Sequence, residues 1–326
     1  MNHFKSFIQY LSRTYLPAFL VLFILFGSAF FLSNNKTAEE EYCRAYNLEI
    51  EDYAWMKKIN KIDGLVLGSS TLRYGLSCGL LQSETYKQWV NLSMDARDPV
   101  VFYLLLSRYL KELKPQIVLV GLDPWIYSKS YYRYRNPIML NDLNCSQKIK
   151  YYSQVDQKLP IRILKSKFFP RNDESQTKNT TVPDDFGSIK LNRQAINFNE
   201  VNQDFFQLAD FGWSQVQFEY LKKIDSLCGL KKVRVIYVIS PKRKDYVSTC
   251  IKKFNFEHNR WWTLINETIP NAEIIGTYGA LKNYDQNKIF AEAYHLNGFG
   301  QNIFSEYVKD NISKSKRVNL NYNFIE

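Results

Sequence analysis

A serine, a glutamate and a histidine have the residue types and spacing that could perform acyl transfer. Ser70 follows an apolar run that stops at Gly68, and Glu292 precedes His295 by three residues. A serine hydroxyl is a weak nucleophile until a base accepts its proton, and a carboxylate holds a histidine base in the required tautomer. A carboxylate three residues before a histidine can turn back onto one ring nitrogen and leave the other facing the serine. We therefore expect Ser70, His295 and Glu292 to form a Ser–His–acid site.

Each of these residues also has an ordinary structural interpretation. Ser70 could be the N-cap of a helix, and His295 could be a surface or core histidine. The two together, with the serine after the first predicted strand and the histidine before the last predicted helix, favour the catalytic interpretation. Asp285 is a weaker alternative to Glu292 as the acid, and His258 has no patterned partner.

Elements that could position these residues follow from the alternation of apolar strand-like runs with helical patterns. The predicted strands lie at 64–68, 89–94, 116–124, 233–241 and 272–279, and the predicted helices at 99–113, 212–230 and 298–310. Short apolar strands separated by helices indicate βαβ units. The sequence therefore predicts an α/β fold with a doubly wound, mostly parallel, five-stranded sheet. Ligands bind at the carboxyl ends of such strands, where Ser70 is expected.

The order of these blocks resembles the SGNH (GDSL-like) hydrolase superfamily over about residues 62–310. The family's Gly-Asp-Ser-like turn is matched by Gly68-Ser69-Ser70, and its Asp-x-x-His block by residues 292–295. The resemblance implies a flavodoxin-like sheet of SGNH type, with Ser70 as the nucleophile. The family acid is Asp, so Glu292 is one methylene longer than the resemblance implies.

The oxyanion site departs further from this resemblance. The family's third block is Gly-x-Asn, whereas the chain has Gly121-Leu122-Asp123, and an ionised Asp has no proton to donate and would repel an oxyanion. The second-block glycine is hard to place within residues 91–99. The backbone N–H of Ser70 remains as a donor. Arg73 is either a cationic substitute or an ordinary solvent or salt-bridge arginine.

Within the superfamily, the set "GSSTLRYG … VGLDPW … HLNGFG" resembles membrane-anchored envelope acyl-transfer proteins of the teichoic acid D-alanylation and alginate O-acetylation type. The resemblance implies an acyltransferase or esterase that acts on acyl esters of cell-envelope glycans or lipids. It also implies a multispanning membrane O-acyltransferase as partner, with envelope polysaccharide or a lipid-linked glycan as substrate. A catalytically inactive SGNH-fold subunit, which scaffolds the acyltransferase or binds polymer, is the alternative.

The N-terminus carries an uncharged apolar run at residues 16–32. Its length is just enough to span a hydrocarbon core, and the flanking charges place the N-terminus in the cytoplasm. The predicted organisation is a cytoplasmic segment (1–14), a transmembrane anchor (15–33), a helical stalk (34–60), an extracytoplasmic SGNH-like domain (61–312) and a tail (313–326). The alternative is a cleaved signal peptide, for which Gly27 and Ala29 offer a small-x-small site.

An insertion at residues 126–211 interrupts the strand–helix alternation. It is rich in Tyr, Asn, Lys and Ser and has weak periodicity. Its length predicts a position at one edge or end of the sheet. It could form a lid or partner surface, or it could be a variable surface elaboration.

Composition excludes several other classes of function. The 326 residues carry a formal net charge of +11, which suits anionic polymers or lipid headgroups, but no nucleic-acid-binding motif accompanies the scattered basic residues. The five cysteines include no C-x-x-C pair, so we expect no metal site and no thioredoxin-like site. No cofactor is expected, and the aromatic content of 16% indicates a packed core.

Overall fold

The structure, a computed structural model, describes part of the chain as two compact units. The described residues are 13, 15–17, 20–21, 23–24, 27, 59, 61–95, 97–128, 143–154, 187–192, 212–248, 255–314, 323 and 325. One unit comprises residues 1–51 and 136–177, and the other comprises 52–135 and 178–326. The candidate site lies entirely in the second unit.

The second unit is built on a five-stranded sheet. The strands are β1 (Gly64–Leu67), β2 (Trp89–Asn91), β3 (Ile117–Gly121), β4 (Arg234–Val238) and β5 (Glu273–Ile275). They lie in the order β2-β1-β3-β4-β5, and every neighbouring pair is parallel. This is the flavodoxin-like order of doubly wound folds. The predicted α/β fold with five parallel strands is confirmed.

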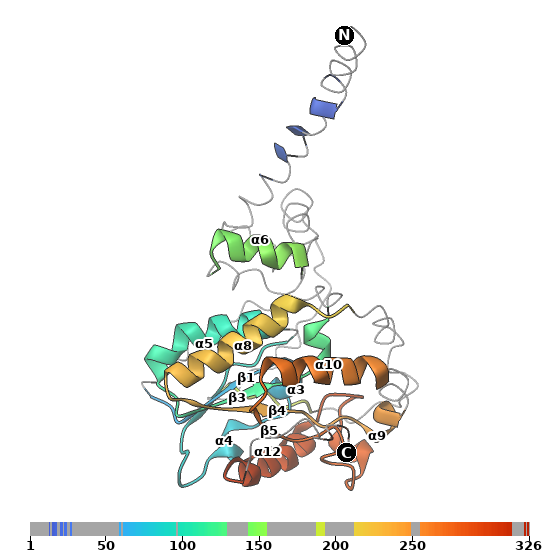
Figure 1. Ribbon diagram of the computed structural model, residues 1–326. Helices are drawn as coiled ribbons and strands as arrows, with labels where there is room; N and C mark the ends of the chain where they lie inside the picture. Colours follow the sequence, from blue (N-terminus) through green and yellow to red (C-terminus); the bar gives the residue numbers. More distant parts are fainter. Residues whose placement is uncertain are drawn as a thin grey trace, which may run out of the picture. The chain divides into compact units, whose positions relative to one another are not determined.

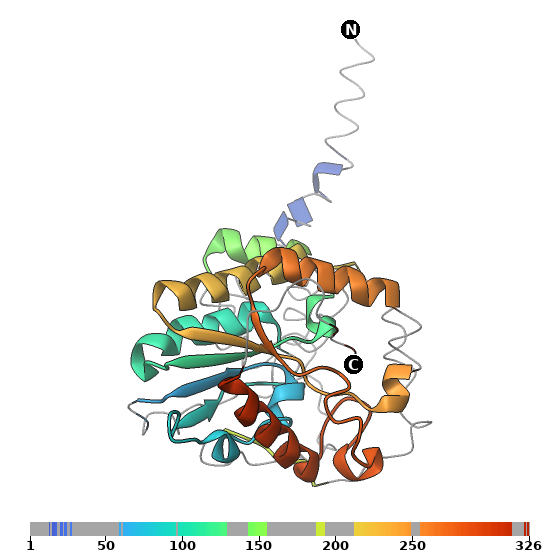
Figure 2. The same ribbon diagram turned by 60° about the horizontal axis from the view of Figure 1, so that its bottom comes forward.

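Helices cover both faces of this sheet (Figures 1 and 2). One layer holds α5 (Pro99–Leu113), α8 (Gln215–Leu230) and α10 (Asn255–Thr268). The other holds α4 (Cys78–Leu81) and α12 (Gly298–Ile312). Burial on both faces explains why β1 and β3 are continuous apolar runs whose residues are all buried.

The strand lengths differ from the predicted ones at their carboxyl ends. β2 ends at Asn91, β3 at Gly121, β4 at Val238 and β5 at Ile275, so the predictions through 94, 124, 241 and 279 were too long. The chain leaves the sheet there for physical reasons. For example, Asp123 caps a 3-10 helix, η2 (Pro124–Tyr127), and Gly276 has a φ of 87°.

The predicted helices need smaller corrections. The helix predicted at 99–113 has these bounds, with Asp98 as its N-cap. The helix predicted from 212 begins at Gln215, because the chain at Trp213 still forms an isolated bridge with Ser128. The last helix continues two residues past 310, to Ile312.

The first unit is described at the single positions and short segments between 13 and 27 and at α6 (Cys145–Gln154). Within the described residues, no helix combines the length and apolar character that crossing a membrane requires. The predicted stalk (34–60), apart from residue 59, and most of the predicted anchor (15–33) lie outside the described residues. So does most of the predicted insertion (126–211), so its role stays a prediction.

Candidate active site

Ser70 stands at the first turn after β1. The strand ends at Leu67, Ser69 is the N-cap, and Ser70 is the first residue of the short helix α3 (Ser70–Arg73). The interpretation of Ser70 as the helix cap is therefore wrong, because Ser69 holds that position. Ser69 directs its hydroxyl at Thr71, with 3.1 Å between the oxygens, and Ser70 is left partly exposed.

His295 lies on a tight loop before α12. The loop closes through a bridge between Phe290 and Leu296, and the N–H of Ala291 donates to the carbonyl oxygen of His295 over 2.9 Å. Asn297 caps α12 by accepting hydrogen bonds from the N–H groups of the first turn. The loop is thus fixed at both ends, and its curvature returns residue 292 to the histidine.

The structure brings Ser70, His295 and Glu292 together. His295 Nε2 lies 2.7 Å from Ser70 Oγ, and His295 Nδ1 is in hydrogen-bonding contact with Glu292 Oε1. With the Nδ1 proton donated to the carboxylate, the lone pair of Nε2 can accept the serine proton. The arrangement has the connectivity of a catalytic triad. Asp285, the weaker acid candidate, instead caps α11 (Gln286–Ile289).

Two tyrosine rings hold the imidazole of His295. Tyr74 meets it edge-on with 5.2 Å between the ring centroids, and Tyr294 lies 4.4 Å from it. The hydroxyl of Tyr74 donates to Asp95 Oδ2 over 2.5 Å. These contacts leave the His295 side chain 10% exposed, so little space remains for the ring to rotate away from Ser70.

Arg73 takes part in this network and is not a free cation. Its guanidinium is buried and lies 3.5 Å from Asp95 Oδ2 and over the ring of Tyr74. Of the two predicted interpretations, the salt-bridge arginine is the one that the structure shows. Arg73 therefore supports the ring that packs on His295, and its charge is already balanced by a carboxylate.

Asp123 is buried and fully engaged. Its Oδ2 lies 3.1 Å from the ammonium of Lys242, and its Oδ1 accepts from the N–H of Trp125 over 3.4 Å. From the sequence, the Asp123 carboxylate is expected to repel an oxyanion. That expectation leaves out Lys242, whose ammonium balances the charge of the carboxylate. Lys242 belongs to the short basic run at 241–244, for which the sequence predicts no role at the site, and its side chain is buried.

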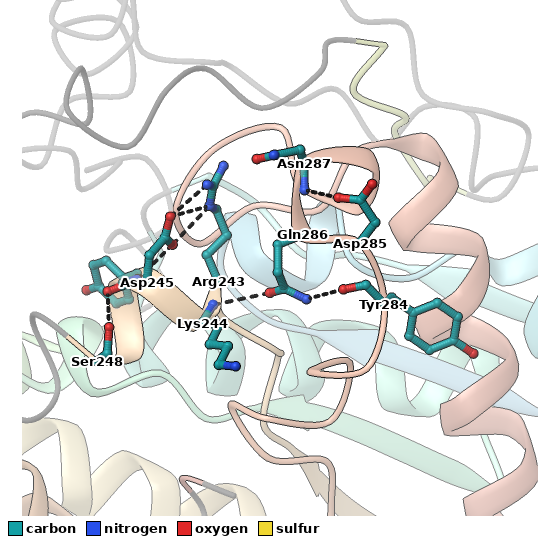
Figure 3. A network of polar contacts seen from close by, with 9 residues as sticks. Arg243, Lys244, Asp245, Ser248, Tyr284, Asp285, Gln286 and Asn287 are labelled. Carbon is teal, nitrogen blue, oxygen red and sulfur yellow. Dashed lines mark hydrogen bonds and ion pairs between the residues drawn. The ribbon is translucent and has the colours of Figure 1, made fainter.

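Backbone hydrogen bonds join the segment that carries Lys242 to the histidine loop and to the chain after β5. The N–H of Lys242 donates to Tyr278, and that of Arg243 donates to Ala293, next to Glu292. Figure 3 shows the Arg243 guanidinium bound to Asp245 and the N–H of Lys244 bound to Gln286.

Few donors remain for an oxyanion. The N–H of Ser93 donates to Asn91 and that of Met94 to Gly68, so both are used within the protein. The N–H of Ser70, at the start of α3, has no acceptor among the described residues. Those residues also include no group of three His, Cys, Asp or Glu side chains that could hold a metal ion.

Three residues at or beside the site were not predicted from the sequence, because their local signals are weak: Tyr74, Asp95 and Lys242. Tyr74 lies within the block "GSSTLRYG" but has no predicted role there, and Asp95 is a single acidic residue after the second strand. Lys242 directly follows the Ser240-Pro241 end of the fourth predicted strand, and this position is the signal that could have placed it at the site edge.

Comparisons with known proteins do not assign a family. No family model matches the chain, and no curated protein matches it. Among solved structures, an arginine-to-alanine mutant of Axe2, an acetyl-xylooligosaccharide esterase from Geobacillus stearothermophilus, is 10% identical with a TM-score of 0.36. A catalytic mutant of Axe2, described as an acetylxylan esterase, is 11% identical with the same TM-score. Each match covers 83% of this chain and 99% of the other, and a likeness at this TM-score leaves the family open.

Proposed function

We propose that the protein is a serine-dependent esterase or acyltransferase that acts on acyl esters. The observation that carries this proposal is the continuous contact from Glu292 through His295 to Ser70 at the carboxyl end of β1. The base lies in hydrogen-bonding reach of both the nucleophile and the acid, and ligands bind at this edge of open parallel sheets.

The proposed reaction has two halves. Ser70 Oγ attacks the acyl carbonyl carbon while its proton passes to His295 Nε2, and the carbonyl π electrons move onto oxygen. The tetrahedral oxyanion then expels the leaving alcohol, which takes the proton from His295, and an acyl-serine remains. Water or a sugar hydroxyl gives its proton to His295 and attacks the carbonyl carbon of the acyl-serine. The bond from that carbon to Ser70 Oγ then breaks, Oγ takes the proton back from His295, and an acid or an acylated product is released. Glu292 holds the Nδ1 proton and offsets the positive charge of the imidazolium in both halves.

We also propose where the domain lies in the cell and which class of acyl ester it acts on. An anchor at residues 15–33 would hold the domain outside the cytoplasmic membrane, where envelope glycans or lipid-linked glycans present acyl esters. The formal net charge of +11 suits anionic polymers of this kind. A multispanning membrane O-acyltransferase is the proposed partner, because the resemblance of the sequence blocks implies one.

A catalytically inactive subunit is the second candidate. It is favoured by the oxyanion region, where the N–H groups of Ser93 and Met94 are used within the protein and Asp123 is committed to Lys242. Losing one oxyanion donor typically costs about 10²–10³ in rate. Such a subunit would keep the fold and bind polymer or a membrane partner without forming an acyl-enzyme.

Fluorophosphonate labelling of the full chain in detergent separates the two candidates. A fluorophosphonate reacts with an activated serine, so the esterase or acyltransferase should be labelled and Ser70→Ala should not. Ser69→Ala is the matched control, because Ser69 is the neighbouring serine and its hydroxyl contacts Thr71. Equal, background labelling of folded wild type and Ser70→Ala would favour the inactive subunit.

A further inference from the structure

A buried ion pair lies beside the proposed active site and takes no part in the reaction as described. Lys242 Nζ is 3.1 Å from Asp123 Oδ2, and the two side chains are 2% and 4% exposed. Asp123 follows β3 and Lys242 follows β4, and these two strands are neighbours in the sheet. The pair is therefore part of the carboxyl edge that also carries Ser70.

Aromatic groups surround this pair. The Lys242 ammonium lies 6.0 Å from the ring centroid of Tyr278 and 5.9 Å from that of Tyr294. In such surroundings each charge is stable only because the other is present, and removing one partner leaves an uncompensated buried charge. The charge of the pair as a whole is zero.

The electrostatic influence of the two charges reaches neighbouring groups. Burial lowers the pKa of His258 on α10 to about 4, while the Asp123 charge acts to raise it and the Lys242 charge acts to lower it. Burial first, and then the Asp123 charge, raises the pKa of Tyr278 well above its usual value. The two partners thus act in opposite directions on a titratable neighbour.

The same pair lies close to His295. The Lys242 ammonium is 5.9 Å from the centroid of Tyr294, whose ring centroid is 4.4 Å from that of His295. These separations place the ammonium within about 10 Å of the imidazole centre, a distance over which buried charges interact. Backbone hydrogen bonds from Lys242 and Arg243 to Tyr278 and Ala293 hold the segment in place.

We propose that Lys242 is a positioning residue that cancels the charge of Asp123 beside the Ser70–His295 pair. Without Lys242, a net negative charge would stabilise the imidazolium of His295 and oppose the oxyanion that forms on the substrate. Lys242 acts through Asp123 and not through contact with a reacting atom. The inference rests on the proposed function for its catalytic meaning, but its electrostatic part can be tested without activity.

Other charged or titratable groups also face the imidazole of His295. These are Glu292 at Nδ1, the hydroxyls of Tyr74 and Tyr294, and the Arg73–Asp95 pair behind Tyr74. None of these groups is replaced in the Lys242 and Asp123 variants, so a change in the titration of His295 in those variants is assigned to the Asp123–Lys242 pair.

Nuclear magnetic resonance of the imidazole groups in the full chain tests the proposal. The chain has three histidines, so the His295 signal can be assigned by replacing His3 and His258. Lys242→Met should move the titration midpoint of His295 up by about half a pH unit or more, and Asp123→Asn should move it down by a similar amount. The double variant Asp123→Asn/Lys242→Met removes both charges and should return the midpoint toward the wild-type value.

Fluorophosphonate labelling measures the catalytic consequence in the same variants. Lys242→Met should slow labelling by about tenfold, and the double variant should recover to within about threefold of wild type. If the single variants do not fold, recovery of folding, midpoint and labelling in the double variant still supports charge cancellation. A folded double variant that stays slow to label would show that Lys242 does more than cancel a charge, and this would overturn the proposal.

A distant ion pair provides the control. Arg234 and Glu273 also form a hydrogen-bonded ion pair, at the amino-terminal ends of β4 and β5. Arg234→Met/Glu273→Gln should leave the His295 midpoint unchanged.

If both Asp123–Lys242 single variants leave the midpoint unchanged or move it in the same direction, the inference fails. A third outcome is that wild type is not labelled while the two single variants shift the His295 midpoint in opposite directions. In that case the proposed function is wrong and the charge cancellation still holds.

Discussion

At the residue scale, Glu292 contacts His295 although its side chain is one methylene longer than that of an aspartate. Its carboxylate reaches Nδ1 of His295 from three residues upstream because the loop is closed by the N–H groups of Ala291 and Glu292, which both donate to the carbonyl oxygen of His295. The extra methylene is accommodated by the loop. The sequence leaves open whether a Glu can act as the acid. The hydrogen bond shows that the Glu292 carboxylate reaches Nδ1 of the histidine.

His258 supplies a residue-scale prediction. It is buried between Trp125 and Tyr278, and burial lowers its pKa to about 4 from an ordinary value of 6.5. Between these values the unfolded chain binds the proton and the folded chain does not, so stability falls as the pH falls from about 6.5 to about 4. His258 should cost about 2 kcal/mol of unfolding free energy between pH 7 and pH 5.

Urea unfolding of wild type and His258→Phe at pH 7 and pH 5 measures this cost. The phenylalanine ring fills similar space and cannot bind a proton, so the variant should lose less stability on acidification. Carboxylates titrate in both proteins, and the comparison between the two proteins removes their contribution. An identical loss of stability in both would contradict the prediction.

The elements position the site through close packing at the carboxyl end of β1. A Cβ placed on Gly68 would lie 2.8 Å from the Cβ of Leu72, a fully buried residue of α3, and this is closer than real Cβ contacts. Gly68→Ala should therefore displace α3, which carries Ser70. We expect fluorophosphonate labelling to slow by at least about tenfold and stability to fall by about 1–3 kcal/mol.

Gly229 provides the matched control for this prediction. It lies exposed on α8, and a Cβ there would meet nothing within 4 Å. Gly229→Ala should keep the wild-type labelling rate and raise stability by about 0.5–1 kcal/mol, because alanine favours the helix. A Gly68→Ala protein that is labelled as fast as Gly229→Ala would show that α3 tolerates the displacement.

Periodicity explains how much of these elements could be predicted. Continuous apolar runs such as β3 and the capped amphipathic pattern of α5 carry strong local signals. The bounds of α5 were predicted correctly, and β3 was predicted to begin one residue early and to end three residues late. The Ser70, Glu292 and His295 side chains were found because their types and spacing recur in a known chemistry. Lys242 was missed because burial of a lysine depends on a partner more than 100 residues away, and no local pattern encodes this.

At the scale of the whole molecule, the apolar N-terminal segment bears on where the site works. At the described positions there, apolar side chains such as Leu20, Val21 and Phe23 are 50–71% exposed. Large apolar side chains exposed together commonly mark contact with lipid or protein. This supports the proposal of a membrane anchor at residues 15–33, with the positively charged side facing the cytoplasm.

Fusions to the C-terminus of the full chain test this topology. An alkaline phosphatase fusion should be active, because the enzyme folds only outside the cytoplasm, and a green fluorescent protein fusion exported through the same route should be dark. Leu20→Lys/Phe23→Lys places two charges near the middle of the apolar run, each of which opposes insertion by about 2.5–3.5 kcal/mol. This variant should reverse both signals. A fluorescent wild-type fusion with inactive phosphatase would put Ser70 in the cytoplasm and remove envelope glycans as substrates, while the acyl-transfer chemistry would stand.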